Sequence, residues 1–185
     1  MSKRVCPWWL GYVLANPVRG WMTDRRKLLA PYVREGMTVL EPGPGMGFFT
    51  MELARLVGPS GRVIAVDLQE KMLRALKRKA KTAGLLDRIE ARLVPAESME
   101  LDDIAGSVDF TLAFAVVHEM PSCEKFFAEV AVASRSGAKM LLVEPAGHVS
   151  ESEFAEELRL ADKAGFVVSG RPGISRSHAA ELSRR

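Results

Sequence analysis

Three glycines alternate behind a glutamate in the stretch VLEPGPGMGFFT, residues 39–50. Glycine at such positions lets a ligand approach the backbone and permits turns with positive φ. Gly43, Gly45 and Gly47 give the spacing GxGxG, whereas the dinucleotide-binding fingerprint GxGxxG needs glycine where this chain has Phe48. A phosphate-binding P-loop is excluded too, because no GK[ST] follows. The stretch therefore predicts a ligand-binding loop of neither kind.

An acidic residue lies about twenty residues beyond this loop, at the distance where a nucleotide-binding fold places its ribose contact. Asp67 ends the apolar run VIAVDL. A carboxylate only accepts hydrogen bonds, which suits two neighbouring ribose hydroxyls. The alternative is that Asp67 caps the next helix. Its distance from the glycine loop favours the ribose role.

Two histidines follow apolar runs farther along the chain, in AFAVVHEMP and LLVEPAGHV. A neutral imidazole accepts a proton near pH 7, so His118 and His148 are candidate general bases, with Glu119 a weaker one. The alternative for His118 is a structural role, capping backbone groups in a loop. His178 is assigned no role. We expect no metal site, because no third ligand lies at suitable spacing.

The candidate site residues are positioned by strands and helices, which the sequence predicts as apolar runs alternating with helical patterns. The expected strands are 37–42, 61–68, 88–94, 107–117, 138–145 and 166–170. The expected helices are 48–57, 69–84, 123–137 and 150–165. Strands that are apolar along their length are buried on both faces, as in a parallel sheet covered by helices. This alternation predicts right-handed βαβ units and a doubly wound α/β domain.

The alternation of strand and helix patterns is less regular at the two ends of the chain. Residues 171–185 predict a weak last strand that forms a hairpin with the strand before it. Ser150 and Glu153 predict a capping box at the start of the last helix. In the N-terminal extension, residues 1–36, TDRRKLLAPYV is helical up to Ala30. The aromatic residues before it either pack this segment onto the sheet or form a lid over the substrate: Trp8, Trp9, Tyr12 and Trp21.

The sequence Glu41-x-Gly43-x-Gly45-x-Gly47 after the first strand resembles motif I of the class I S-adenosylmethionine-dependent methyltransferases. The resemblance extends from residue 37 to about residue 170 and includes Asp67. It implies a Rossmann-like, mostly parallel seven-stranded sheet with the last strand antiparallel. It also implies S-adenosylmethionine as cofactor and S-adenosylhomocysteine as product. In that family the loop wraps the methionine part and the ribose of the cofactor.

The resemblance implies further contacts to the cofactor. Ala96 and Glu97, after the third strand, match the adenine contact, and Leu68 would cover an adenine face. Phe114 and Ala115 would border the sulfonium. The form VVHEMP resembles small-molecule methyltransferases of the broad group that includes ubiquinone- and menaquinone-biosynthesis enzymes. It does not resemble the DPPY or NPPY loop of amino-directed nucleic-acid methyltransferases.

The amino-acid composition limits the number of domains, the class of binding partner and the cellular location to be expected. The 185 residues, 48% apolar and 26% charged, predict one globular domain spanning residues 1–185. A net charge of +3 is too weak to indicate nucleic acid. Cys6 and Cys123 form no disulfide or zinc pattern, and we expect a cytoplasmic protein without a membrane span.

The expected partner is a small-molecule acceptor, methylated at oxygen, nitrogen, sulfur or carbon. The alternatives are a non-catalytic module that binds S-adenosylmethionine, an RNA methyltransferase supported only by the basic helix at 69–84, and a nicotinamide-dependent oxidoreductase. The misplaced third glycine argues against the last of these. The oligomeric state stays open.

Overall fold

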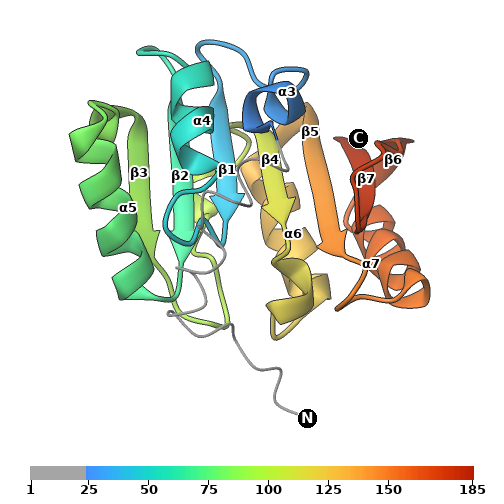
Figure 1. Ribbon diagram of the computed structural model, residues 1–185. Helices are drawn as coiled ribbons and strands as arrows, with labels where there is room; N and C mark the ends of the chain where they lie inside the picture. The colour runs from blue at the N-terminus through green and yellow to red at the C-terminus, as the bar shows by residue number, and fades with distance from the viewer. Residues whose placement is uncertain (1–23) are drawn as a thin grey trace. The chain divides into compact units, whose positions relative to one another are not determined.

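A computed structural model describes residues 24–185 (Figure 1). The aromatic N-terminal segment, with its two alternative roles, lies outside the described residues. The described chain divides into two compact units, residues 24–94 and residues 95–185. That the chain folds as a single domain stays a prediction.

The described part of the first unit, residues 24–94, has one short parallel sheet. Its elements are α3 (Arg25–Leu29), β1 (Thr38–Pro42), α4 (Thr50–Leu56), β2 (Arg62–Asp67), α5 (Glu70–Thr82), the 3-10 turn η1 (Leu86–Arg88) and β3 (Ile89–Leu93). Strand β2 pairs in parallel with β1 on one side and β3 on the other. Helix α4 packs on β2, and α5 packs on β2 and β3 (Figure 1). All three strands therefore end at the same edge.

Helix α5 shows why this unit folds as its sequence pattern predicts. One face is buried: Met72, Leu73, Leu76 and Ala80. Each such side chain contributes about 1–3 kcal/mol when it leaves water. Six of the thirteen residues of the helix are Lys or Arg and one is Glu, and they lie on the rest of its surface. Short α3 begins at Asp24, whose side chain accepts a hydrogen bond from the Lys27 N–H at 3.0 Å.

The second unit, from Pro95 to Arg185, combines parallel and antiparallel pairing. Its elements are η2 (Asp102–Ile104), β4 (Val108–Phe114), η3 (Val117–Glu119), α6 (Cys123–Ala133), β5 (Ser134–Pro145), α7 (Glu151–Lys163), β6 (Phe166–Gly170) and β7 (Ser177–Arg184). Strands β4 and β5 are parallel, and β7 runs antiparallel to both β5 and β6. Helix α6 packs on β5, α7 packs on β6, and the two helices contact each other.

The strands form a seven-stranded sheet with the order β3-β2-β1-β4-β5-β7-β6. The predicted fold class is therefore confirmed, including the antiparallel last strand. The hairpin of β6 and β7 is confirmed as well, because Phe166 lies opposite Arg184 in their antiparallel register. The C-terminal segment has a weak strand pattern, yet it forms β7 because β5 and β6 both provide hydrogen-bond partners for its backbone.

Two expected boundaries are wrong. The strand expected over 107–117 ends at Phe114, because Ala115 turns into the left-handed region with a φ of 55°. The helix expected over 123–137 ends at Ala133, and residues 134–137 begin β5 instead. Ser134 is extended and pairs with Val108 of β4, a pairing that the local sequence does not reveal.

The capping box of α7 is confirmed. The Ser150 side chain accepts from the Glu153 N–H at 3.3 Å, and the Glu153 carboxylate accepts from the Ser150 N–H at 2.8 Å. Within residues 24–185, none of the helices has the length and apolar character that crossing a bilayer requires.

Candidate functional site

The glycine loop follows β1 and is bent by left-handed backbone at each glycine. Gly43, Gly45 and Gly47 have φ values of 65°, 54° and 81°. The Gly43 N–H donates to the carbonyl of Val66 at 2.9 Å, which ties the start of the loop to β2. The Gly47 N–H closes the turn on the carbonyl of Pro44 at 3.0 Å. Residues with a Cβ rarely adopt these φ values, so the backbone itself explains the glycines.

The second and third glycines have different surroundings. A Cβ built on Gly45 would meet no atom within 4 Å. A Cβ on Gly47 would lie 2.5 Å from Cδ1 of Leu76 on α5. Gly47 thus lets the loop pack against α5, whereas the space beside Gly45 is open to a ligand.

Glu41, at the end of β1, is a buried carboxyl group with an unused acceptor. Its side chain is 3% exposed, and Oε2 has no hydrogen-bond partner among the described residues. Burial raises the pKa of Glu41 to about 7; Thr50 opposes the rise, and the charge of Asp67 adds to it. A buried, unpaired carboxyl oxygen of this kind is costly unless something binds it, so Glu41 is a candidate for a cationic ligand group.

Asp67 is the last residue of β2, and Leu68 follows it. Asp67 is 9% exposed, and its Oδ1 accepts the Gln69 N–H at 2.8 Å. The N-cap of α5 is Gln69, so Asp67 does not cap that helix. Leu68, next in the chain, is 41% exposed. An acceptor and an apolar surface therefore lie side by side beyond β2.

In the second unit, His118 is held by a buried glutamate. The Glu144 side chain on β5 is fully buried, and its Oε2 is hydrogen-bonded to Nδ1 of His118. Its Oε1 accepts the N–H groups of Val116 and Val117 at 3.2 and 2.8 Å. Part of the imidazole stays accessible, because the His118 side chain is 19% exposed. His118 thus caps no backbone group within the described residues; its partner is a carboxylate.

The hydrogen bond with Glu144 raises the pKa of His118 above its usual value. Partial burial opposes the rise, and the negative charges of Glu144, Glu119 and Glu157 support it. The other candidate, His148, is exposed and lies edge-to-face against His118, with 5.7 Å between the ring centroids. The two predicted bases are therefore neighbours in space. The described residues contain no group of three side chains able to hold a metal ion.

The remaining expected contacts also lie in the second unit. Phe114 ends β4 half-buried, and the Ala115 N–H donates to the Val143 carbonyl at 2.7 Å. Ala96 and Glu97 are exposed in the loop before η2. The next residues of that loop, Ser98 and Met99, are fixed by the Glu129 carboxylate at 2.8 Å. The cofactor roles of these residues stay predictions.

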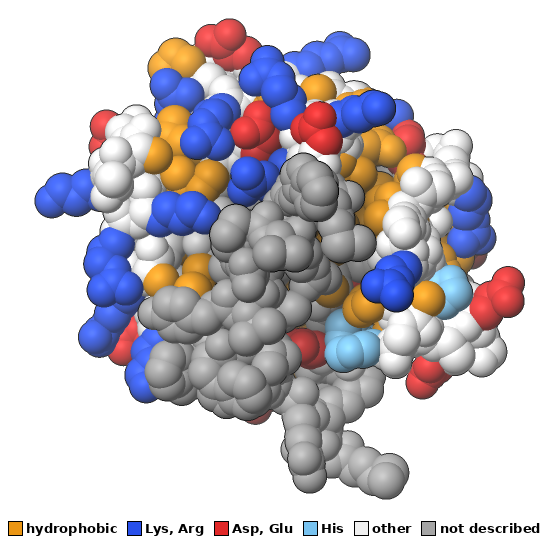
Figure 2. Space-filling model, in the orientation of Figure 1, with side chains coloured by type: hydrophobic (Ala, Val, Ile, Leu, Met, Phe, Trp, Pro, Cys, Tyr) orange, Lys and Arg blue, Asp and Glu red, His pale blue; other side chains and the backbone are white. Residues whose placement is uncertain are grey.

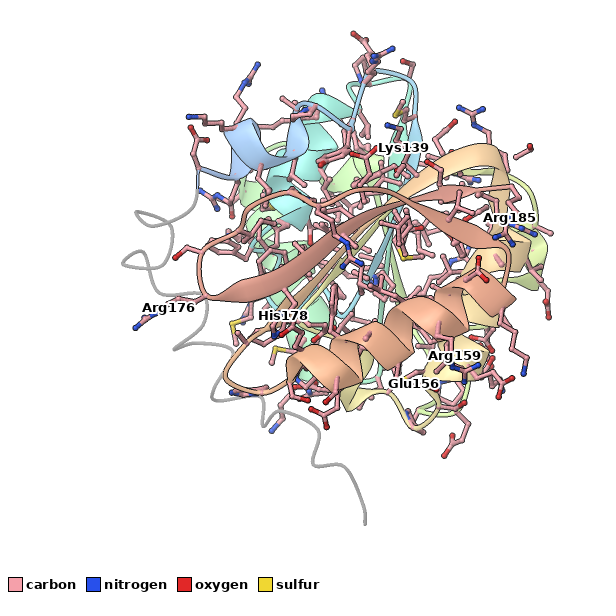
Figure 3. All side chains as sticks on the ribbon, turned by 90° about the vertical axis from the view of Figure 1, so that its right-hand side faces the viewer. Lys139, Glu156, Arg159, Arg176, His178 and Arg185 are labelled. Carbon is pink, nitrogen blue, oxygen red and sulfur yellow. The ribbon has the colours of Figure 1, made fainter. Side chains whose placement is uncertain are left out.

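His178, on β7, lies opposite Glu144 in the antiparallel pairing of β5 and β7. Figure 3 shows it near the start of β7, beside α7. Its ring stacks on Phe154 with a centroid distance of 5.5 Å, and Nε2 is hydrogen-bonded to the Val149 carbonyl. This packing accounts for His178 without a catalytic role.

Comparison with known protein families decides between the cofactor classes. Residues 33–169 match a family model described as a methyltransferase domain. The chain belongs to this methyltransferase family. A solved S-adenosylmethionine-dependent methyltransferase from Aquifex aeolicus is similar along its whole length: 25% identity, a TM-score of 0.84, and coverage of 97% of this chain and 98% of that one. A solved protein from Methanococcus maripaludis, 12% identical, shares the fold with a TM-score of 0.78 over 100% of this chain and 97% of its own.

The curated relatives are longer proteins. The ubiquinone/menaquinone biosynthesis C-methyltransferase UbiE of Klebsiella pneumoniae is 27% identical over 156 residues, which cover 82% of this chain and 61% of that protein. The UbiE protein of Pasteurella multocida is 29% identical over 112 residues, or 60% of this chain and 41% of that one. The methyltransferase thus spans between about two fifths and three fifths of these relatives' length. S-adenosylmethionine is the cofactor of its family.

The residues of the first unit fit S-adenosylmethionine. The open space at Gly45 admits a ligand to the backbone, and the unpaired Oε2 of Glu41 can accept from an ammonium group. Asp67 would provide the acceptor for a ribose diol, and Leu68 would provide the apolar surface for a base. These assignments of cofactor contacts stay predictions.

Glu144 is the site residue that the sequence analysis missed. Its one signal is a charged residue at the end of the apolar run KMLLVEP, where a parallel strand ends. Sequence spacing does not reveal the pairing, because 26 positions separate Glu144 from His118.

Proposed function

We propose that the methyltransferase transfers the methyl group of S-adenosylmethionine to a small-molecule acceptor. The observation that carries this proposal is the glycine loop, bent at three glycines, between Glu41 and Asp67 at the ends of two adjacent parallel strands. When bound, the cofactor supplies a methyl group activated by sulfonium. Much of the rate enhancement then comes from holding the acceptor and the methyl group in line at close distance.

Each predicted cofactor-site residue of the first unit has a proposed role. Asp67 accepts both ribose hydroxyls, Leu68 covers one face of adenine, and Glu41 accepts from the ammonium of the methionine part. The glycine loop approaches the cofactor through its backbone. The other predicted site residues have proposed contacts to the cofactor or the acceptor: Ala96, Glu97, Phe114, Ala115, His118 and His148.

A small-molecule acceptor is supported by the names of the curated relatives, which are biosynthetic C-methyltransferases. The form VVHEMP around His118 adds support, since it resembles small-molecule enzymes rather than nucleic-acid ones. Because the chain spans only part of these relatives, their acceptors are not transferred to it. A cytoplasmic location is part of the same proposal.

Calorimetry with S-adenosylhomocysteine tests cofactor binding directly. We expect the wild type to bind and Asp67→Ala to lose at least tenfold in affinity, because two hydroxyl hydrogen bonds are removed. Asp87→Ala, which removes an exposed carboxylate of η1, is the matched control and should bind like the wild type. Wild-type protein that does not bind, or Asp67→Ala that binds undiminished, would refute the proposal.

RNA methylation is a second candidate, favoured by one observation. Lys and Arg side chains gather over α5 (Figure 2), and Lys77, Arg78 and Lys81 form no ion pair within the described part of the chain. Retention on RNA that falls steeply with salt would support this candidate. Turnover of labelled methyl groups into small metabolites, with no transfer to RNA, would exclude it, and any turnover would exclude a purely binding module.

A further inference from the structure

The carboxylate of Glu144 connects the turn after β4 to the imidazole of His118. One oxygen accepts two consecutive backbone N–H groups, from Val116 and Val117, and the other is bonded to the ring. The turn begins at Ala115, a non-glycine residue with a φ of 55°. Such backbone is strained for a residue with a Cβ and persists where surrounding contacts enforce it. Glu144 is therefore positioned to fix both the turn and the ring that follows it.

This arrangement determines which ring nitrogen carries the proton. An ionised carboxylate has no hydrogen to donate, so Nδ1 of neutral His118 must be the N–H donor. The lone pair of the neutral ring then lies on Nε2. A histidine oriented in this way is prepared to accept a proton from a molecule bound beside it.

The surroundings of the ring favour its protonated form. The charged and titratable groups around it are Glu144 on β5, Glu119 on η3, Glu157 on α7, and His148 in the turn after β5. Three of these four groups are carboxyls that stabilise an imidazolium. The ring of His148 lies edge-to-face against that of His118.

We propose that Nε2 of His118 removes a proton from the methyl acceptor, and that Glu144 is the positioning residue that prepares it. The acceptor is then a hydroxyl compound, a thiol or a carbon acid, and not a thioether or a tertiary amine, which have no such proton to lose. The proton moves to Nε2, the electron pair left on the acceptor atom bonds to the methyl carbon, and the carbon–sulfur pair remains on sulfur as the neutral thioether. This inference rests on the proposed function.

Nitrogen NMR of histidine-labelled protein tests the dyad without any acceptor. Single His→Gln variants assign the three rings, and His178→Gln is the control that should leave His118 unchanged. We expect neutral His118 as the Nδ1–H tautomer, and a drop of at least tenfold in its proton affinity in Glu144→Gln. An Nε2–H tautomer, or a proton affinity that Glu144→Gln does not change, would overturn the proposal.

Methyl transfer gives the second readout. With labelled S-adenosylmethionine and the small-molecule fraction of a cell extract, His118→Gln should transfer at least 100-fold more slowly than wild type, the contribution expected of a general base. Its affinity for S-adenosylhomocysteine should stay within about threefold, since the carboxylates that we propose to bind the cofactor are Glu41 and Asp67. Label that appears in a sulfonium or a quaternary ammonium product, formed from a thioether or a tertiary amine, would contradict the proposal. Wild-type protein without any transfer would count against the proposed function, while NMR still decides the dyad.

Discussion

Gly47 of the cofactor loop and Leu76 of α5 pack so closely that no Cβ fits between them. A methyl group on Gly47 would lie 2.5 Å from Cδ1 of Leu76, a side chain that is fully buried. Gly45, two residues earlier, has a similar left-handed backbone but open space around its Cα. The two glycines thus serve different purposes, packing at Gly47 and access at Gly45.

Substituting each glycine with alanine separates these purposes. Gly47→Ala should lower the free energy of unfolding by about 2–4 kcal/mol, from backbone strain plus overpacking against α5. Gly45→Ala should lower it by only about 1–2 kcal/mol, the strain alone, yet bind S-adenosylhomocysteine at least tenfold more weakly. Urea unfolding and calorimetry measure both quantities. Equal losses of stability in the two variants would show that the contact with Leu76 is unimportant.

The carboxyl group of Glu41 predicts a pH-dependent stability. Its folded pKa of about 7 lies above the value of 4.5 for an exposed glutamate. Between these values the folded state binds more protons than the unfolded state, so stability falls as pH rises from about 4.5 to about 7 and is then constant. The loss attributable to Glu41 is on the order of 3 kcal/mol at most.

Glu41→Gln should remove this slope. The difference in unfolding free energy between wild type and Glu41→Gln, measured by urea titration from pH 4.5 to 8, isolates Glu41 from other groups. His118 must be separated in this way, because its raised pKa also makes stability fall as pH rises. A difference that stays constant across this range would mean that Glu41 titrates like an exposed glutamate.

Leu68 predicts a modest contribution to cofactor affinity. The side chain is 41% exposed, and covering its free surface with a base would stabilise the complex by about 1 kcal/mol. Leu68→Ala should therefore weaken S-adenosylhomocysteine binding roughly fivefold, with the unfolding free energy changed by less than about 0.5 kcal/mol. Val168→Ala, at a side chain that is 44% exposed on β6, is the control. Unchanged binding in Leu68→Ala would remove this residue from the cofactor site.

The capping box at Ser150 predicts a local contribution to stability. Ser150→Ala removes the hydroxyl that accepts the Glu153 N–H at the start of α7. The expected cost is about 1 kcal/mol, seen as a lower urea midpoint with an unchanged slope. Ser175→Ala, in the exposed loop before β7, should leave the midpoint unchanged. A Ser150→Ala protein as stable as the wild type would indicate that solvent replaces the lost cap.

The local sequence determines the positions of the strands, the glycine loop and the capping box. Apolar runs locate its strands because a strand buried on both faces needs apolar residues along its whole length. The glycine spacing and Asp67 indicate the cofactor through their resemblance to a family motif, which single residues at short intervals are enough to carry. The same holds for the capping box, whose two members are three residues apart.

Interactions between segments that are distant in the sequence are visible only in the tertiary structure. The register of β4 and β5 turns residues 134–137 into strand, although they continue a helical pattern. The pairing of His118 with Glu144 depends on the ends of two neighbouring strands, and the burial that raises the pKa of Glu41 depends on the elements around it. Sequence spacing does not encode such relationships, because hydrogen bonding between strands and exclusion of water are properties of the packed chain.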